Sequence, residues 1–313
     1  MRLSPIILLL VAIAITAPLE AQQAGAPFTV QETGESFARL DEALASLEEG
    51  DGTIVIAPGT YRQCGRQQGG RVAFVAAEPG TAIFDGRACE GKAALVLNGD
   101  ATRVEGLVFR NIAVEDGNGA GLRLQTGDLT VVDSMFADSQ QGILTADDSA
   151  IDVTIEHSTF SGLGTCEDSS GCAHSIYIGR IGSLTVTASR FERGTGGHYV
   201  KSRAARVAIT DSSFDDSHGR ATNYLIDLPN GATGVIAGNT FVFGADKENR
   251  TGLIALAAND TSNSSVGLAI TGNTASLAPG IAWRTSFLAD WSGQAVRLAD
   301  NEIGNGIDLQ SRH

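Results

Sequence analysis

The chain has 313 residues, with 36 Asp or Glu against 22 Lys or Arg, which gives a formal net charge of −14 at pH 7. A chain this acidic repels the phosphate backbone, so general nucleic-acid binding is excluded as its function. The 38 glycines and the low aromatic share of 6% are typical of a turn-rich β structure.

Residues 1–21 have the pattern of a secretory signal peptide. One basic residue precedes an apolar run from Ile6 to about Ala17, and small residues follow near Ala21. The run is too short for a comfortable membrane span, so we expect cleavage after Ala21. No later segment of the sequence is long and apolar enough to span a bilayer. The sequence thus predicts a secreted or periplasmic monomer, with one domain over residues 22–313.

Residues 36–50 interrupt the β pattern with the spacing of a helix. Apolar side chains recur on one helical face, and Gly50 follows as a stop signal; they are Phe37, Leu40, Leu44 and Leu47. The end of a stacked-repeat protein exposes apolar surface that must be covered. An amphipathic helix at this point therefore predicts an N-terminal cap, followed by a strand and a tight turn over residues 51–61.

One short phrase recurs through the rest of the chain: a β-rich stretch, a turn residue, an aromatic residue and then polar residues. VEGLVFRN (104–111) and IAGNTFVF (236–243) are two of its copies. The aromatic position returns every 23 to 34 residues, at Phe109, Phe136, Phe160, Phe191, Phe214 and Phe241, and then as Ala275 and Ile303. Self-similarity at this period predicts a solenoid of stacked coils.

Each coil also contains a second short strand, about 14–16 residues before the aromatic position. These strands are expected at 94–98, 121–125, 142–146, 175–179, 199–203 and 225–229. Strands at this spacing cannot form hairpins, but they can pair in parallel with their equivalents in neighbouring coils. The fold class is therefore predicted to be all-β, a parallel β-helix with Leu, Ile, Val and Phe stacked inside.

Over about residues 28–310 the chain resembles the right-handed parallel β-helix, pectin-lyase-like superfamily. The resemblance includes the opening FARLDEALASL…GTIVIAPGTY. It implies a right-handed solenoid that acts on or binds carbohydrate, since the superfamily includes lyases, hydrolases, epimerases and non-catalytic modules.

Four cysteines suit the exported compartment that the signal peptide predicts. Pairing Cys64 with Cys89 and Cys166 with Cys172 is the simplest of the three possible connectivities. The CxxxxxC loop of the second pair could instead hold a metal. However, it lacks further thiol or histidine ligands at regular spacing, so we expect two disulfides.

The charge balance inverts between His174 and Arg220. This stretch holds seven Lys or Arg residues, four acids and three of the five histidines. A local basic patch on an acidic protein indicates that an anionic ligand is held there.

Aligning three consecutive coils on their inward residues sharpens this prediction. With Ile176, Val200 and Ile226 pointing inward, the outward column consists of Tyr177, Lys201 and Asp227. Coils stack at about 4.8 Å, so these side chains become neighbours. The same alignment brings two further groups to this side of the coils: Arg203, one outward step along, and His174, His198 and Tyr224 at the entrance to the strands.

These residue types suit β-elimination on a uronic-acid polymer, an anionic polysaccharide. Such a lyase needs cations for the carboxylate, a base of tuned pKa and an acid at the leaving oxygen. We expect Arg203, with Arg220, to bind the carboxylate. The candidate catalytic residues are Lys201 or His198 as base, Tyr177 or Tyr224 as acid, Asp227 to orient Lys201, and His174 beside them. Lyases and epimerases with this fold resemble the arrangement in using such residues on an outward sheet.

Four alternatives remain open. A polar ladder, in which Lys201 pairs with Asp227, would need no ligand and contribute about 0–1 kcal/mol per pair. A hydrolase needs two carboxylates about 5–9.5 Å apart, and an epimerase shares only the proton abstraction. A non-catalytic cell-envelope module could bind carbohydrate with the same face. No cofactor is required, although calcium could bind the acidic pairs at 147–148, 167–168 and 215–216.

Overall fold

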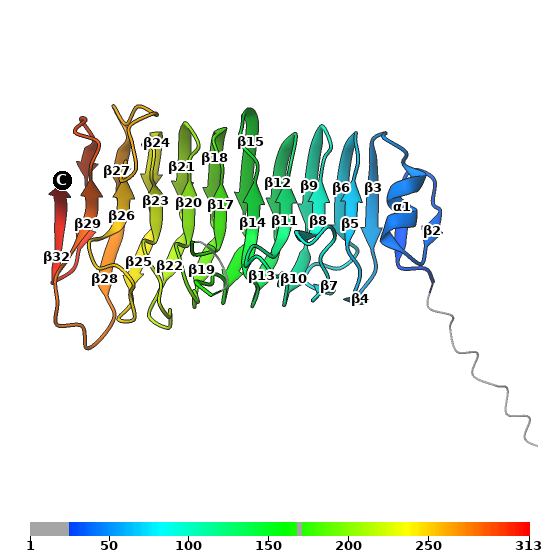
Figure 1. The fold of residues 1–313 in the computed structure, drawn as a ribbon, viewed down its shortest axis with the longest axis horizontal. Coiled ribbons are helices and arrows are strands. Elements are labelled where there is room, and N and C mark those ends of the chain that lie inside the picture. The colour runs from blue at the N-terminus through cyan, green and yellow to red at the C-terminus, as the bar shows by residue number, and fades with distance from the viewer. Residues whose placement is uncertain (1–24, 168–170) are drawn as a thin grey trace, which may run out of the picture.

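The computed structural model describes residues 25–167 and 171–313, which form an elongated, all-β parallel solenoid (Figure 1). The predicted signal peptide, residues 1–21, lies outside the described residues. The chain passes in turn through three sheets, which we call A, B and C. As a result, strands three apart in the chain lie side by side.

The three sheets run the length of the solenoid, and every pair of strands is parallel except those made by β1. Sheet A consists of β1 (Phe28–Val30), β2 (Ser36–Phe37), β3 (Gly52–Ile56), β6 (Arg71–Ala76), β9 (Ala101–Glu105), β12 (Asp128–Val132), β15 (Asp148–Glu156), β18 (Ile181–Thr187), β21 (Arg206–Thr210), β24 (Thr233–Ala237), β27 (Ala269–Thr271) and β30 (Arg297–Ala299). Sheet B consists of β4 (Gly59–Tyr61), β7 (Ala82–Asp85), β10 (Leu107–Arg110), β13 (Met135–Ala137), β16 (Thr159–Ser161), β19 (Arg190–Glu192), β22 (Ser213–Asp215), β25 (Thr240–Phe243), β28 (Thr274–Leu277) and β31 (Glu302–Ile303). Sheet C consists of β5 (Gly65–Gln67), β8 (Ala93–Leu97), β11 (Ala120–Leu124), β14 (Gln141–Thr145), β17 (Ile176–Ile178), β20 (Val200–Ser202), β23 (Ile226–Leu228), β26 (Gly252–Leu256), β29 (Thr285–Asp290) and β32 (Ile307–Arg312).

The aromatic position of the repeat forms one continuous column inside the solenoid. Each residue pairs in register with its equivalent in the next coil, from Phe109 through to Ile303, as the spacing predicted. From Phe84 to Phe241 the buried rings stack nearly parallel, with centroids 4.7 to 5.4 Å apart. Such pairs contribute about 0.5–1.5 kcal/mol beyond the burial of apolar area. This column therefore fixes the register of the whole solenoid.

The corner between sheets A and B explains the turn residue of the repeat. At Asp133, His157 and Asp211 the backbone adopts φ of 48° to 52°, the left-handed region, which reverses the chain sharply. The next residue is serine or asparagine, and its side-chain oxygen accepts a hydrogen bond from the equivalent N–H of the preceding coil; Ser158 receives the N–H of Ser134 in this way. These bonds satisfy backbone donors that the corner leaves outside the sheets.

The predicted helix over residues 36–50 is longer than the observed one. α1 spans Leu40–Ser46, while Ser36–Phe37 forms β2 and pairs antiparallel with β1. The side-chain oxygen of Gln63 accepts the N–H of Leu40 at 2.9 Å, and this long-range bond stabilises the helix start there. Among the described residues, no helix is long and apolar enough to cross a bilayer.

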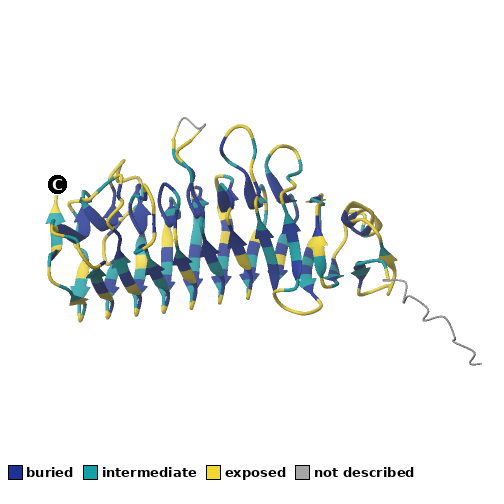
Figure 2. Ribbon diagram, turned by 90° about the horizontal axis from the view of Figure 1, so that it is seen from below, coloured by how far each residue is buried: buried dark blue, intermediate teal, exposed yellow. Residues whose placement is uncertain are grey.

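Both predicted disulfides are present, Cys64–Cys89 and Cys166–Cys172. The alternative of a metal in the CxxxxxC loop is wrong, because these two sulfurs bond to each other. Figure 2 shows the longer loops projecting from one side of the solenoid, with short turns on the opposite side. The loop that carries Cys166–Cys172 lies between β16 and β17, so the disulfide constrains a connection between sheets B and C.

Candidate functional site

The register of sheet C brings together the outward column that the sequence predicted. Tyr177 pairs with Lys201, and Lys201 pairs with Asp227, on β17, β20 and β23. Leu144 and Ala255 flank the column on the neighbouring strands. We call the outward side of these three strands, with the residues at their ends, the sheet C face.

A second column of rings stands beside it, at the entrance to the same strands. The centroids of His174 and His198 are 4.7 Å apart, and His198 and Tyr224 follow at 5.4 Å, nearly parallel. Nδ1 of His174 accepts the backbone N–H of His198, and Nδ1 of His198 accepts that of Tyr224, at 3.0 and 3.1 Å. Each neutral imidazole therefore carries its proton on Nε2.

Nε2 of His198 lies 3.3 Å from Oδ2 of Asp227. Burial, opposed in part by Lys201 and Arg203, raises the pKa of Asp227 from 3.8 to about 6. Burial first, and then nearby cations, hold the pKa of both His174 and His198 well below the usual value. The His198–Asp227 contact thus joins two groups that favour their neutral forms. Oδ1 of Asp227 is buried without a hydrogen-bond partner.

The cations of the face gather around the ring of Tyr177. Nζ of Lys201 lies 5.1 Å from the ring centroid, and Nε of Arg203 donates to the Tyr177 hydroxyl at 3.1 Å. The other end of the Arg203 guanidinium donates to Oδ1 of Asn230, whose amide in turn donates to Asp260. Arg203 is therefore oriented by neutral acceptors rather than by an ion pair.

Burial divides the predicted site residues into two groups. Four of the predicted catalytic residues, His174, His198, Tyr224 and Asp227, are at most 8% exposed. Tyr177, Lys201 and Arg203 are partly exposed. The accessible part of the face thus holds one candidate base, Lys201, and one candidate acid, Tyr177, while the two imidazoles, Tyr224 and the Asp227 carboxylate lie beneath the surface.

Arg220 does not join this face. It is exposed in the loop between β22 and β23, where its backbone N–H donates to the carbonyl of Gly194. Within residues 25–167 and 171–313, no hydrogen bond or ion pair connects its side chain to the sheet C face. The expected pairing of Asp227 with Lys201 is also absent, because the carboxylate turns toward His198 instead.

A fully buried ion pair behind the face was not predicted from the sequence. Nζ of Lys247 lies 2.9 Å from Oδ2 of Asp216, and both side chains are 0% exposed. The Asp216 carboxylate also accepts hydrogen bonds from the hydroxyls of Tyr199 and Thr222. The network ties the loop that precedes Tyr224 to the loop that carries Lys247 and to Tyr199, the residue after His198. Lys247 follows an aspartate in a polar loop, a pattern that ordinarily indicates solvated charge, so the sequence offers no signal for it.

In two of the acidic pairs considered for calcium, one carboxylate forms an ion pair with a cationic side chain. Asp216 forms an ion pair with Lys247, and Asp147 forms one with Arg180 at 3.1 Å. Asp168 lies outside the described residues.

Arg123 is a further outward residue that the sequence analysis missed. It pairs in register with Leu144, which pairs with Tyr177, so it belongs to the same column. A pocket of about 370 Å³ lies between Arg123 and Tyr177, with Lys92 and Asp116 in its wall. Nε of Arg123 is buried without a partner. The strand predicted at 121–125 contains this signal, because Arg123 occupies its outward position two coils before Tyr177.

The fold and this face define the class: a parallel β-solenoid protein with a cationic, aromatic patch on one sheet. No family model matches the chain, and no curated protein matches it. Membership of the pectin-lyase-like superfamily therefore stays a prediction.

The comparison with solved structures gives three matches. ORF18 of Geobacillus virus E2 matches with a TM-score of 0.51 at 12% identity, over 83% of this chain and 57% of that chain. The present chain thus spans little more than half of the viral protein. Two structures of PfbA, a surface adhesin of Streptococcus pneumoniae, match with TM-scores of 0.47 and 0.43 at 12% and 11% identity, over 87% of this chain and 88% and 94% of theirs. At these identities the likeness concerns the fold alone.

Proposed function

We propose that this protein binds an acidic polysaccharide on the sheet C face, without transforming it. One observation carries the proposal. Lys201 and Arg203 lie on the same side of the strand, about 7 Å apart, and neither forms an ion pair with a carboxylate of the described residues. Tyr177 contacts both cations. In a protein of net charge −14, this is a local site of positive charge.

The chemistry of the face favours uronic-acid units over other anions. A guanidinium and an ammonium beside each other bind carboxylates through charge-assisted hydrogen bonds. The Tyr177 ring offers apolar surface for a sugar ring and a hydroxyl for its polar edge. The column continues past Leu144 to Arg123, so a polymer lying along the solenoid would meet a third cation about 14 Å from Lys201.

Burial argues against Asp227 and His198 as the base of a lyase, which leaves Lys201 as the accessible candidate. A general base must come within about 3 Å of the proton that it removes. Oδ1 of Asp227 is inaccessible, and Nε2 of His198 already carries a proton in the neutral ring. In this proposal the exposed residues of the face bind the ligand, and the buried residues keep the exposed ones in position.

Polysaccharide lyase activity by β-elimination is the second candidate, and the pKa of Asp227 favours it. A carboxylate with a pKa of about 6 is a better base than an ordinary aspartate. In this lyase mechanism Lys201 and Arg203 bind the substrate carboxylate. Asp227 accepts the proton from the substrate once the side chains that cover its carboxylate have moved. Tyr177 then protonates the leaving oxygen.

The handedness of the solenoid, the N-terminal helix and the disulfides are part of the proposal for an exported polysaccharide-binding protein. Right-handed winding follows from the strong preference of parallel crossovers for that hand. α1, whose Leu40 and Leu44 are buried, covers the first coil as a cap. Two disulfides suit secretion or the periplasm, where a monomer would meet polysaccharide.

Calorimetric titration with uronic-acid oligomers and neutral oligomers of equal length tests the proposal. Wild type should bind only the acidic series, and K201A/R203A should weaken binding about tenfold or more. R180Q is the matched control, because Arg180 follows β17 but is paired with Asp147. Equal affinity for neutral oligomers, or an unaffected double variant, would refute acidic recognition. Absorbance appearing in the near ultraviolet during incubation would establish elimination and replace the binding function with the lyase.

A further inference from the structure

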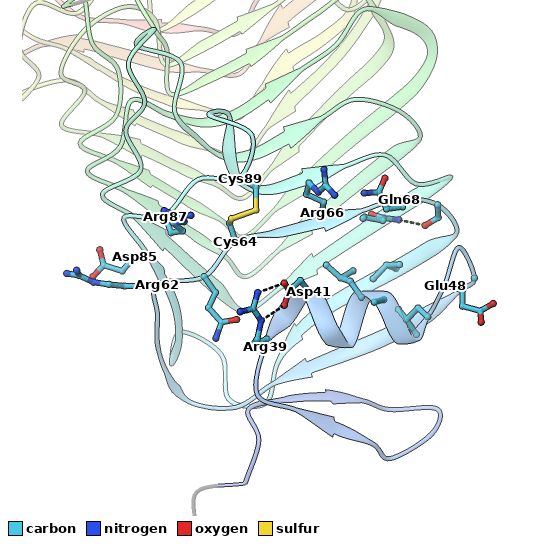
Figure 3. A pocket seen from close by; sticks show the side chains of 18 of the residues that line it. Arg39, Asp41, Glu48, Arg62, Cys64, Arg66, Gln68, Asp85, Arg87 and Cys89 are labelled. Atoms are coloured by element: carbon cyan, nitrogen blue, oxygen red, sulfur yellow. Dashed lines mark hydrogen bonds and ion pairs between the residues drawn. A yellow bond between two sulfur atoms is a disulfide. The ribbon is translucent and has the colours of Figure 1, made fainter.

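We infer that a second ligand site, for a sugar phosphate or sulfate ester, lies at the N-terminal end of the solenoid. A cavity of about 1150 Å³ opens there between α1 and the segments 62–69 and 85–89 (Figure 3). Of the described residues that line it, none belongs to β17, β20 or β23. The cavity is therefore separate from the sheet C face, and its ligand does not depend on the function proposed there.

Arginine dominates the chemistry of this cavity. Four arginines line it, and Figure 3 shows them around the Cys64–Cys89 disulfide: Arg39, Arg62, Arg66 and Arg87. Two of the four are neutralised. Nε of Arg39 donates to Asp41 at 2.9 Å, and Arg66 donates to Glu90 at 2.8 Å.

The other two guanidinium groups have no such partner. Neither Arg62 nor Arg87 forms an ion pair with a carboxylate in the described part of the chain. Asp85, the acid that Figure 3 shows beside Arg62, is already occupied: one oxygen accepts from Arg110 and the other from Asn111. Arg62 therefore shares the charge of Asp85 with Arg110 and forms no ion pair of its own among the described residues, Arg87 forms none either, and both side chains are exposed.

Three kinds of contact hold the walls of the cavity in place: a disulfide, the hydrogen bonds of one side chain and close backbone packing. The disulfide joins Cys64 to Cys89 across it. The Gln63 amide binds α1 by accepting the N–H of Leu40 and donating to the carbonyl of Ala38. Gly65 packs so closely on the helix that an added Cβ would lie 2.7 Å from Leu40. Arginines on a rigid frame lose less conformational freedom when they bind a ligand.

The donor set selects the ligand class. A guanidinium presents a planar fork of N–H donors that matches the oxygens of phosphate and sulfate. The cavity is much larger than one oxyanion and exceeds the usual range of about 300–1,000 Å³ for small-molecule sites. Side chains such as Gln68 and Glu48 add polar groups for hydroxyls. A phosphorylated or sulfated hexose therefore fits both the charge and the space.

Calorimetry on the full chain with glucose 6-phosphate, glucose 6-sulfate and glucose tests the inference. We expect at least one ester to bind and glucose not to bind. The double variant R62Q/R87Q should weaken ester binding about tenfold or more. R39Q is the matched control, since its guanidinium is committed to Asp41 in the same cavity, and it should change affinity about twofold at most. Thermal unfolding would verify that these exposed substitutions leave the fold intact.

The two esters distinguish phosphate from sulfate recognition, and K201A/R203A distinguishes the two sites. The latter variant should bind the ester as wild type does. No saturable heat with either ester would overturn the inference. So would unchanged affinity in R62Q/R87Q, or a loss of affinity in K201A/R203A that the cavity variant does not share.

Discussion

His198 presents the protonated nitrogen of its neutral ring to Asp227, with Nε2 3.3 Å from Oδ2. The backbone N–H of Tyr224, one coil further along, enforces this arrangement by donating to Nδ1. The stacking of coils therefore sets the tautomer of the histidine as well as its position. Since both side chains are buried, the contact makes the protein sensitive to pH.

Asp227→Asn should remove the contribution of the Asp227 carboxyl group to the pH dependence of folding stability. A raised pKa means that the folded state holds the proton more tightly, so Asp227 favours folding below pH 3.8 and loses this effect as the pH passes about 6. Between pH 4 and 7 the wild type should therefore lose about 2.5 kcal/mol of stability relative to the variant.

Urea unfolding of both proteins across this pH range measures the difference. His174 and His198 act in the opposite sense, because their lowered pKa makes stability fall as the pH drops below 6.5. Both histidines are present in wild type and variant, so the difference isolates Asp227. Parallel profiles for the two proteins would contradict the raised pKa.

Lys247→Met should destabilise the protein by about 3–5 kcal/mol, because it leaves the Asp216 carboxylate buried without its cation. Chemical denaturation at pH 7 measures the loss. Arg180→Gln is the control, since its pair with Asp147 is exposed and contributes about 1 kcal/mol or less. If the two variants were equally stable, the buried Lys247–Asp216 pair would not stabilise the loops that it joins.

Phe160→Ala should cost about 3–5 kcal/mol, because it opens a cavity in the middle of the aromatic column. Met135→Ala lies one coil away on sheet B but is 37% exposed, so it should change stability by about 0.5 kcal/mol or less. Thermal or urea unfolding compares the two. A cost at Phe160 no greater than at Met135 would show that the rings do not set the stability of the coil.

Removing the Cys64–Cys89 disulfide with serines should destabilise the protein more than removing Cys166–Cys172. The first closes a separation of 25 residues and the second only 6. Loop-closure entropy predicts costs of about 3.5 and about 2 kcal/mol. Unfolding of the two double variants under identical conditions measures the order. The reverse order would mean that the short loop contributes contacts beyond chain entropy.

The repeat in the sequence was sufficient to predict the solenoid and the alignment of Tyr177, Lys201 and Asp227. The reason is physical: inward and outward residues alternate strictly along a strand, so one inward match sets every outward neighbour. The same periodicity placed His174, His198 and Tyr224 in one column. Disulfide pairing was also predictable, because four cysteines allow few connectivities.

Only the tertiary structure decided which of those residues are accessible and which partner each one takes. Asp227 turns to His198 rather than to Lys201, and Lys247 reaches Asp216 across 31 positions of the sequence. The helix is also shorter than its apolar spacing predicted, since Gln63 stabilises its start at Leu40. Loops follow no period, so their packing, the burial it imposes and the cavity beside Cys64–Cys89 depend on contacts between distant segments.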